Sequence, residues 1–338
     1  MRPGEPPPTI GIMLPIGYGI EPHDLVELAV TAEGHGLDAV GTGEFASTEA
    51  FALLGALAQA TEGIRLETAV VSIATRSPAL LAMAANTVAA LSGNRFVLGI
   101  GAGSPIVSSF HGEVFERPLD RVAETLIDVK AVLAGGSIEG TGGFKLRGVE
   151  ARAVPVFVSA MNDRMFKLAA READGVVIQF VGPRQVAELV PTLRAERAAA
   201  GNDSPFEIVA LIHAAADHDG DPESVYRREM APYLAVPTYR NSAIALSSVE
   251  EVDAATEAWK TGGRDAAAAA FPSTIVEAGL AIGGDALAAR IADLLDAGCT
   301  GVRFVPVSVG GDDASPAFGL VERIAEVMTD RLHQEARP

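Results

Sequence analysis

The sequence has almost no cysteine and no long apolar run. Cys299 is the only cysteine among 338 residues, so the chain cannot form an internal disulfide. Gly, Pro or a charged residue interrupts every apolar run within about a dozen residues, whereas a membrane-spanning helix needs about 20. Residues 1–14, MRPGEPPPTIGIML, lack the apolar core of a secretory signal peptide. We therefore expect a cytoplasmic protein with no membrane partner.

Basic residues are also scarce. The chain has 26 Lys and Arg against 44 Asp and Glu, a formal net charge of −18. An acidic surface of this kind repels phosphate backbones, so we do not expect a nucleic-acid partner. If the ligand is an anion, a local group of backbone N–H groups or an arginine has to hold it.

The sequence does have a regular alternation of short β-branched runs and longer segments with helical periodicity. Hydrophobic residues make up 49% of the chain, which is enough for a large core. Eight parallel strands with helices between them close into a (β/α)8 TIM barrel of the α/β class, whereas open sheets more often have five or six. The expected strands are Thr9–Leu14, Asp38–Thr42, Ile64–Val71, Arg95–Gly101, Pro155–Ser159, Gly175–Gln179, Phe206–His213 and Gly301–Val305.

Helices are expected between these strands. Their ranges are Pro22–His35, Thr48–Thr61, Ala79–Leu91, Pro118–Leu133, Arg164–Glu172, Pro183–Ala200, Asp285–Ala297 and Ala317–Arg331. Two segments are longer than a crossover needs: the Gly-rich residues 135–154, after the helix that follows strand four, and residues 220–283, after strand seven. We expect one domain over residues 1–338 with two insertions, which cover or shape the site.

The residues that follow the strands share one mouth of the barrel, where such folds place their active sites. They are mostly Gly, Ala, Ser and Val, and they form no acyl-transfer triad, zinc cluster or phosphate loop ending in GKS or GKT. We expect no metal. A bound organic cofactor is the natural source of reactivity at such a mouth.

Two stretches at the mouth could contact a cofactor. GIGAGS, residues 99–104, only approaches the dinucleotide fingerprint, and we interpret it as a turn where backbone comes close to a ligand or a neighbouring strand. The stretch from Ser159 ends a strand and opens a helix near Asn162 to Arg164, which predicts a phosphate seat at a helix N-terminus. Asn162 tolerates left-handed angles and Arg164 adds a positive charge. The alternative is an ordinary helix start, with Asp163 as its carboxylate.

Several of these stretches resemble a known family. Residues 76–90 (RSPALLAMAANTVAA), 91–103 (LSGNRFVLGIGAG) and 168–175 (LAAREADG) are similar to the luciferase-like monooxygenase superfamily. The resemblance is closest to the branch that uses the deazaflavin coenzyme F420 and includes methylenetetrahydromethanopterin reductase. It runs from the first strand to Gly182 and resumes over residues 282–306.

The resemblance implies a bacterial-luciferase-like barrel, a bound F420, and a homodimer packed through helices of the first half. It also implies a cis peptide bond between Ala69 and Val70 that supports the cofactor ring. By match, the cofactor-binding residues are Ala69, Val70, Ser72, Gly101, Ala102, Gly103, Ala160, Asn162, Asp163, Arg164 and Met165.

Two residues are candidates for proton transfer. Many relatives have an Asp–His or Glu–His pair after strand two, but this chain has Glu44–Phe45 and lacks the imidazole. Glu44 is then the only ionisable residue of the pair, with a possible role in protonating or orienting the substrate. His111, after strand four, could overhang the mouth as a general acid, or be a loop histidine with no chemical role.

Other residues near the mouth allow two interpretations each. Arg76 either holds an anionic tail or forms an ion pair at a helix start. His213 either faces the substrate or is a hydrogen-bonded wall residue. Tyr233, Tyr239 and Trp259 either line a substrate pocket or fasten a lid to the barrel.

Three interpretations of function follow. The leading one is an oxidoreductase that moves a hydride between F420 and a small organic substrate. The second is an FMN-dependent monooxygenase served by a separate reductase. The third is a non-catalytic flavin-binding barrel, which the missing histidine at Phe45 supports weakly.

Overall fold

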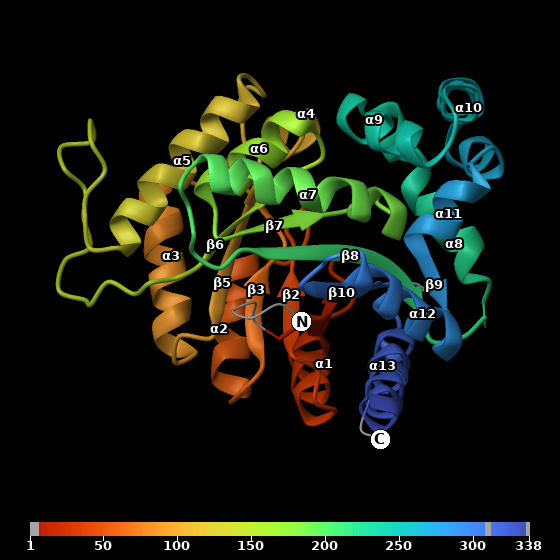
Figure 1. Ribbon diagram of the computed structural model, residues 1–338, viewed down its shortest axis with the longest axis horizontal. Helices are drawn as coiled ribbons and strands as arrows, with labels where there is room; N and C mark the ends of the chain where they lie inside the picture. The colour runs from red at the N-terminus through yellow and green to blue at the C-terminus, as the bar shows by residue number, and fades with distance from the viewer. Residues whose placement is uncertain (1–6, 219, 308–311, 336–338) are drawn as a thin grey trace.

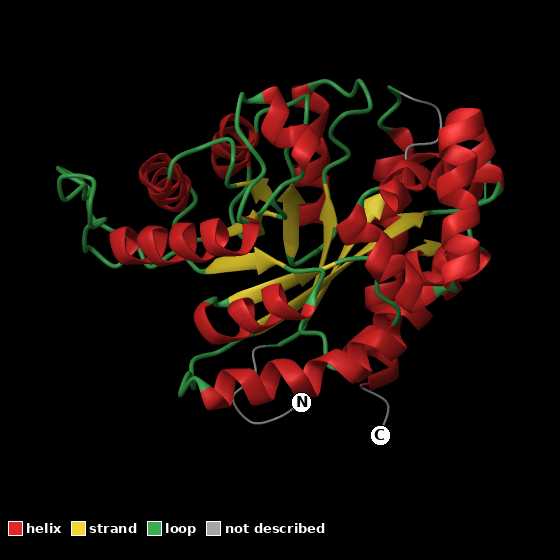
Figure 2. Cartoon of the chain, turned by 90° about the horizontal axis from the view of Figure 1, so that it is seen from above, coloured by secondary structure: helices red, strands yellow, loops and turns green. Residues whose placement is uncertain are grey.

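The chain folds into a closed parallel β-barrel surrounded by helices (Figures 1 and 2). The computed structural model describes residues 7–218, 220–307 and 312–335. Strands follow one another around the barrel in chain order, and β10 closes it by pairing with both β1 and β8. The barrel strands are β1 (Thr9–Met13), β2 (Ala39–Thr42), β3 (Arg65–Thr68), β5 (Phe96–Gly101), β6 (Val156–Ser159), β7 (Gly175–Ile178), β8 (Glu207–Ala215) and β10 (Gly301–Pro306).

The (β/α)8 barrel predicted from the alternation is confirmed, with two differences in its strands. The third predicted strand is divided, because the chain bulges at Ala69 and Val70 and resumes as β4 (Val71–Ser72), which pairs with β5. A short strand that was not predicted, β9 (Leu280–Ile282), pairs with the last three residues of β8. Three apolar residues between two helices give no recognisable alternation, which is why β9 was missed.

The helices around the barrel begin and end close to the predicted positions. They are α1 (Pro22–Gly34), α2 (Ala50–Ala60), α3 (Pro78–Leu91), α5 (Pro118–Leu133), α6 (Asp163–Glu172), α7 (Pro183–Ala199), α12 (Gly283–Asp296) and α13 (Ser315–Glu335). Local capping explains one of these starts: the Ser77 hydroxyl accepts a hydrogen bond from the Leu80 N–H at 3.2 Å, and Pro78 occupies the first helical position.

Alternation along each strand divides the side chains between two cores. Outward residues such as Leu66, Leu98 and Val158 pack beneath the helices. Inward residues such as Met13, Phe157 and Val209 fill the barrel axis. The axis is therefore a packed interior, and any ligand site has to lie at its mouth.

The first insertion lies between α5 and β6. Its residues 135–154 form an extended excursion in which Ile138 and Phe144 make an isolated antiparallel bridge (Figure 1). Most of its residues are exposed.

The second insertion is helical and has its own small core. It contains α8 (Pro222–Met230), the 3-10 helix η1 (Ala231–Ala235), α9 (Pro237–Leu246), α10 (Val249–Ala269) and α11 (Ser273–Gly279). Figure 1 shows these elements gathered at the end toward which β8 runs. Their buried residues, among them Tyr226, Leu234 and Ile275, pack together with Phe180 of the barrel.

None of the helices within the described ranges is both long and apolar enough to cross a membrane.

Candidate functional site

The bulge after β3 is held against the glycines of β5. The peptide bond between Ala69 and Val70 is cis, the geometry that the resemblance implied. A Cβ at Gly101 would lie 2.9 Å from Val70 Cγ2, and a Cβ at Gly103 would lie 2.3 Å from Ser72 Oγ. Gly103 also has a φ of +72°, which disfavours any side chain. The glycines of residues 99–104 thus provide the close backbone approach predicted for them, and the neighbour is the bulge.

The side chains of this part of the predicted cofactor site differ in accessibility. Ala69 and Ser72 are buried, whereas Val70 and Ala102 are half-buried and Gly103 is open to solvent on one side. Val70 packs against the apolar interior of the barrel. A ring that rests on this surface would meet Val70 and the backbone around Gly103.

A short helix that was not predicted follows the glycines directly. α4 covers Pro105–Phe110, and the Ser104 hydroxyl accepts a hydrogen bond from Val107 N–H at its start. We expected the helix after β5 to begin near Pro118, because a run of six residues shows no clear periodicity. This segment carries His111 at its C-terminal end and places it at the rim.

The predicted phosphate seat is a capped helix N-terminus. Asn162 precedes α6, and its side-chain oxygen accepts a hydrogen bond from Met165 N–H at 3.1 Å. Asn162 tolerates left-handed angles but does not adopt them here, because it has φ −151° and ψ 160°, the extended conformation of an N-cap. The amides of Asp163 and Arg164 come first in the helix and have no partner inside it.

Two of the predicted phosphate contacts are already occupied within the protein. Ala160 and Met165 have buried side chains in the main core. The Ala160 N–H donates to Val177 O and the Met165 N–H to Asn162. The groups left for an anion are the first amides of α6 and Arg164, which is exposed and makes no ion pair within the described ranges. Such a set fits the anionic arm of a flavin or deazaflavin.

Glu44 is fixed by a bidentate ion pair with Arg76. The Arg76 Nη1 and Nη2 atoms each lie 2.6 Å from a Glu44 carboxylate oxygen, and Arg76 also contacts Glu49. Burial by itself would raise the pKa of Glu44, but the hydrogen bonds and charge of Arg76 lower it below its ordinary value. Of the two interpretations of Arg76, these contacts support the ion pair at a helix start rather than a site for an anionic tail. Glu44 is therefore a carboxylate at neutral pH and has no proton to donate.

The two catalytic candidates from the sequence lie close together on the rim. His111 is near enough for its charge to act on the Glu44 carboxylate. Between their elements, the Phe45 and Phe110 rings meet edge to face at 5.7 Å, and each residue is 56% exposed. At the position where the resemblance implied an imidazole, this chain thus presents an exposed aromatic surface.

The second insertion is fastened to the barrel at the loops after β6 and β7. The Tyr239 ring packs edge to face on Phe180 at 5.5 Å, and Tyr233 lies 4.9 Å from Tyr239. The Ser242 hydroxyl donates to Met161 O at 3.4 Å. These contacts support the interpretation of the insertion's tyrosines as a lid fastening, and Trp259 packs against the same core.

His213 is part of the wall where β8 meets the insertion. Its ring packs edge to face against Tyr226 at 5.1 Å. Burial lowers the pKa of His213 to about 4, so the imidazole is neutral at physiological pH. The wall interpretation is the one that these contacts support.

Two polar residues at the mouth, Tyr18 and Glu229, were not among the predicted site residues. Tyr18 lies in the loop after β1, and its hydroxyl donates to Glu229 Oε2 of α8 at 2.8 Å. The position of Tyr18, a few residues past a predicted strand, is a signal that could have identified it. Nothing comparable identified Glu229, which is one of several acidic residues in an insertion without a recognised pattern.

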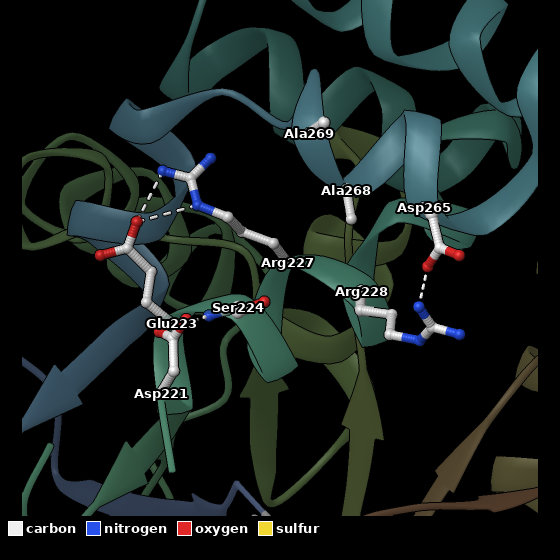
Figure 3. A pocket seen from close by; sticks show the side chains of 8 residues that line it. All are labelled: Asp221, Glu223, Ser224, Arg227, Arg228, Asp265, Ala268 and Ala269. Atoms are coloured by element: carbon white, nitrogen blue, oxygen red, sulfur yellow. Dashed lines mark hydrogen bonds and ion pairs between the residues drawn. The ribbon is translucent and has the colours of Figure 1, made fainter. Parts of the chain in front are cut away.

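A groove of about 390 Å³ lies elsewhere, between α8 and α10 of the insertion (Figure 3). Four of its charged side chains are paired with one another, Arg227 with Glu223 and Arg228 with Asp265, and the Asp221 carboxylate accepts a hydrogen bond from Ser224 N–H. All the residues that line it belong to the insertion, and we do not assign the cofactor to it. No group of three or more potential metal ligands occurs in the part of the chain that the structure describes.

The fold is a (β/α)8 barrel whose mouth carries the bulge at Ala69 and Val70, the glycines after it and the N-terminus of α6. The sequence pattern of the luciferase-like monooxygenase family matches residues 9–301, and the chain belongs to this family. It is 33% identical over 198 residues to a 5,10-methylenetetrahydromethanopterin reductase of Archaeoglobus fulgidus, a match that covers 56% of this chain and 59% of the reductase. It is 27% identical over 262 residues to an F420-dependent glucose-6-phosphate dehydrogenase of Rhodococcus erythropolis, covering 70% and 77%.

Solved structures agree with the fold. The F420-dependent tetrahydromethanopterin reductase of Methanopyrus kandleri superimposes with a TM-score of 0.76 at 21% identity, over 96% of this chain and 99% of that one. At this level of identity the likeness supports the architecture alone.

Proposed function

We propose that the protein is an oxidoreductase that binds coenzyme F420 at the barrel mouth and transfers a hydride between the coenzyme and a small organic substrate. The observation that carries the proposal is the N-terminus of α6 on a chain with a net charge of −18. Arg164 is exposed there, pairs with no acidic residue of the described part of the chain, and lies beside two amides that have no partner inside the helix. The relatives named for F420 support the choice of coenzyme.

In this proposal the main contribution of the protein is to position the coenzyme and the substrate, and acid–base chemistry is secondary. A bound deazaflavin supplies or accepts the hydride at its C5 atom. Val70 and the backbone from Gly101 to Gly103 support the ring, and Asn162 to Arg164 hold the anionic arm. Glu44 keeps Arg76 and the loop after β2 in place, while Phe45 and Phe110 present an apolar surface to the substrate.

A binding experiment tests the coenzyme. We expect equilibrium dialysis of the purified protein to show binding of F420 in preference to FMN. Arg164→Ala should weaken F420 binding about tenfold or more, since it removes a charge-assisted hydrogen bond to the arm. The matched control is Lys167→Ala on the same helix, which removes a cation already paired with Glu196.

Dialysis against both cofactors, followed by a turnover assay, decides between the candidates. Preference for FMN would make the protein a flavin-dependent monooxygenase, and binding of neither cofactor would overturn the enzymatic proposal. Binding without turnover of any substrate would favour the non-catalytic barrel, in line with Phe45 in place of a histidine.

We also propose that the protein acts in the cytoplasm as a homodimer. Helix α3 presents Leu80, Met83 and Leu91 to solvent along one side, each between 45% and 49% exposed, which is unusual for large apolar side chains on a free helix. Light scattering is expected to give twice the mass of 34.9 kDa. Leu80→Lys combined with Met83→Glu should reduce it to one chain.

A further inference from the structure

The contact between Tyr18 and Glu229 joins the barrel to the insertion at the mouth. Tyr18 lies between β1 and α1, and Glu229 is the penultimate residue of α8, 211 positions further along the chain. The Tyr18 hydroxyl donates to Glu229 Oε2 at 2.8 Å, and neither residue is fully exposed. No arginine or lysine forms an ion pair with Glu229 within the described ranges.

The position of the pair follows from the fold. The loop that carries Tyr18 leaves the carboxyl end of β1, and the insertion that carries Glu229 leaves the carboxyl end of β8. Both strands flank β10, so the two chain segments converge on one side of the mouth. Glu44, the other carboxyl identified at the mouth, is held as a carboxylate in its ion pair with Arg76.

The surroundings of Glu229 favour its protonated form. Burial raises the pKa of Glu229 above its ordinary value, and the Tyr18 hydrogen bond and the charge of Arg264 only partly oppose this. Tyr233 faces the pair from η1, and Arg264 faces it from α10. Burial, followed by the effect of Glu229, also raises the pKa of Tyr18, so this phenol stays neutral and serves as a hydrogen-bond donor.

We propose that Glu229, oriented by Tyr18, is the proton donor to the substrate, and that the substrate is a carbonyl compound reduced to an alcohol or, if conjugated, to the saturated ketone. The inference rests on the proposed F420-dependent function and deepens it. A carboxyl that holds its proton can pass it to a carbonyl oxygen as negative charge develops there during hydride addition.

The step balances with the reduced coenzyme as the only reductant. The hydride forms a new C–H bond at the carbonyl carbon, the π electrons of the C=O bond move to oxygen, and the Glu229 proton forms the O–H bond. For a conjugated enone the hydride adds at the β-carbon and the proton ends at the α-carbon. The substrate gains two electrons, the coenzyme loses two, and Glu229 is left as a carboxylate that solvent reprotonates.

Glu229→Gln tests the proposal while keeping a hydrogen-bond acceptor for Tyr18. The probes are acetone, benzaldehyde and cyclohex-2-enone with reduced F420. We expect kcat for the accepted probe to fall about 100-fold, with the F420 dissociation constant within twofold of the parent. The control is Glu250→Gln, an exposed carboxyl in the first turn of α10, which should leave kcat unchanged.

Tyr18→Phe tests the orienting role through the pH profile. The hydrogen bond from Tyr18 lowers the pKa of Glu229, so its removal should raise that pKa. The descending limb of the kcat profile should then shift to higher pH. A purely structural role for Tyr18 would leave the position of that limb unchanged.

A readout without turnover monitors Glu229 itself. If the pKa of Glu229 is raised by folding, the folded protein keeps this proton at a pH where the unfolded chain has lost it. The parent should therefore lose stability relative to Glu229→Gln as pH rises from about 4.3 through the folded pKa. We expect the difference in Tm between the two proteins to change over that window, and Glu250→Gln to show no such change.

The possible outcomes separate the two proposals. If neither parent nor variant binds F420, the proposed function fails and this inference fails with it. If the parent binds F420 and reduces a probe, but Glu229→Gln is equally active, only the role of Glu229 is wrong. If the parent binds F420 and reduces none of the three probes, the assigned substrate class is wrong.

Discussion

Glu67 and Arg303 meet inside the barrel, although 236 positions separate them in the sequence. Arg303 Nε lies 2.6 Å from Glu67 Oε1, and both side chains are almost completely buried. Arg303 also donates to Thr9 O at 3.0 Å, and Arg65 links Glu67 to Glu207. The charges occupy the end of the barrel away from the mouth and tie four strands together.

Removal of one charge from this network should be strongly destabilising. Glu67→Gln leaves Arg303 buried without a full counter-charge, and we expect the free energy of unfolding to fall by about 3 to 5 kcal/mol. Urea denaturation measures the change. Glu250→Gln, at an exposed position, should stay within about 0.5 kcal/mol of the parent. A loss below 1 kcal/mol for Glu67→Gln would mean that the network is not needed for stability.

The contact between Gly103 and Ser72 should tolerate no side chain. Gly103→Ala adds a Cβ at a residue with a positive φ, and this Cβ would also clash with the Ser72 hydroxyl. The substitution should therefore lower the free energy of unfolding by about 1 to 3 kcal/mol more than Gly→Ala at a position that has only the positive φ. Gly142→Ala is the matched control, because Gly142 has φ +71° and nothing within 4 Å of its added Cβ. Equal losses from the two substitutions, measured by thermal unfolding, would show that the bulge is free to move.

His213 should make the fold sensitive to mild acid. Its pKa is lowered from 6.5 to about 4 in the folded state, so the unfolded chain takes up the proton first as pH falls. The parent should lose stability, on the order of 3 kcal/mol, between pH 6.5 and pH 4. His213→Gln should lack this part of the loss, whereas His23→Gln, at an exposed position, should retain it. Parallel stability curves for the parent and His213→Gln would contradict the assignment.

Tyr239 should fasten the insertion through its ring. Tyr239→Ala removes the ring from Phe180 and is expected to loosen α9, with faster hydrogen exchange and proteolysis over residues 231–246. The loss of this half-buried ring should cost up to about 3 kcal/mol. Tyr239→Phe keeps the ring and loses only the hydroxyl's hydrogen bond with Gln179, so it should stay close to the parent. If both variants were equally protected, the insertion would be held by other contacts.

The barrel could be predicted because its signals are local and repeated. Helix α5 begins at Pro118 and ends at Leu133, both as expected, since proline at the first position and a clear apolar stripe mark its ends. The contacts that define the mouth are not local. Tyr18 and Glu229, or Glu67 and Arg303, come together only after closure of the barrel, and no spacing in the sequence relates them.

The predicted cofactor residues show the same difference between local signals, which the sequence carries, and side-chain contacts, which it does not. The sequence located the bulge at Ala69 and the helix start at Asn162, where resemblance and capping rules agree. It could not tell that the Met165 amide is bonded to Asn162, or that Arg76 belongs to Glu44, because both depend on where side chains point. Their roles toward a cofactor remain predictions.

The fastening of the insertion to one side of the rim leaves an asymmetric entrance. Its contacts reach the loops after β1, β6 and β7, and the sector between β2 and β5 holds Phe45 and Phe110 instead. This side of the rim is therefore apolar, because Phe45 and Phe110 are each 56% exposed there. In the proposed function, a substrate that approaches from this side would meet two aromatic rings first, which favours an apolar substrate over a charged one.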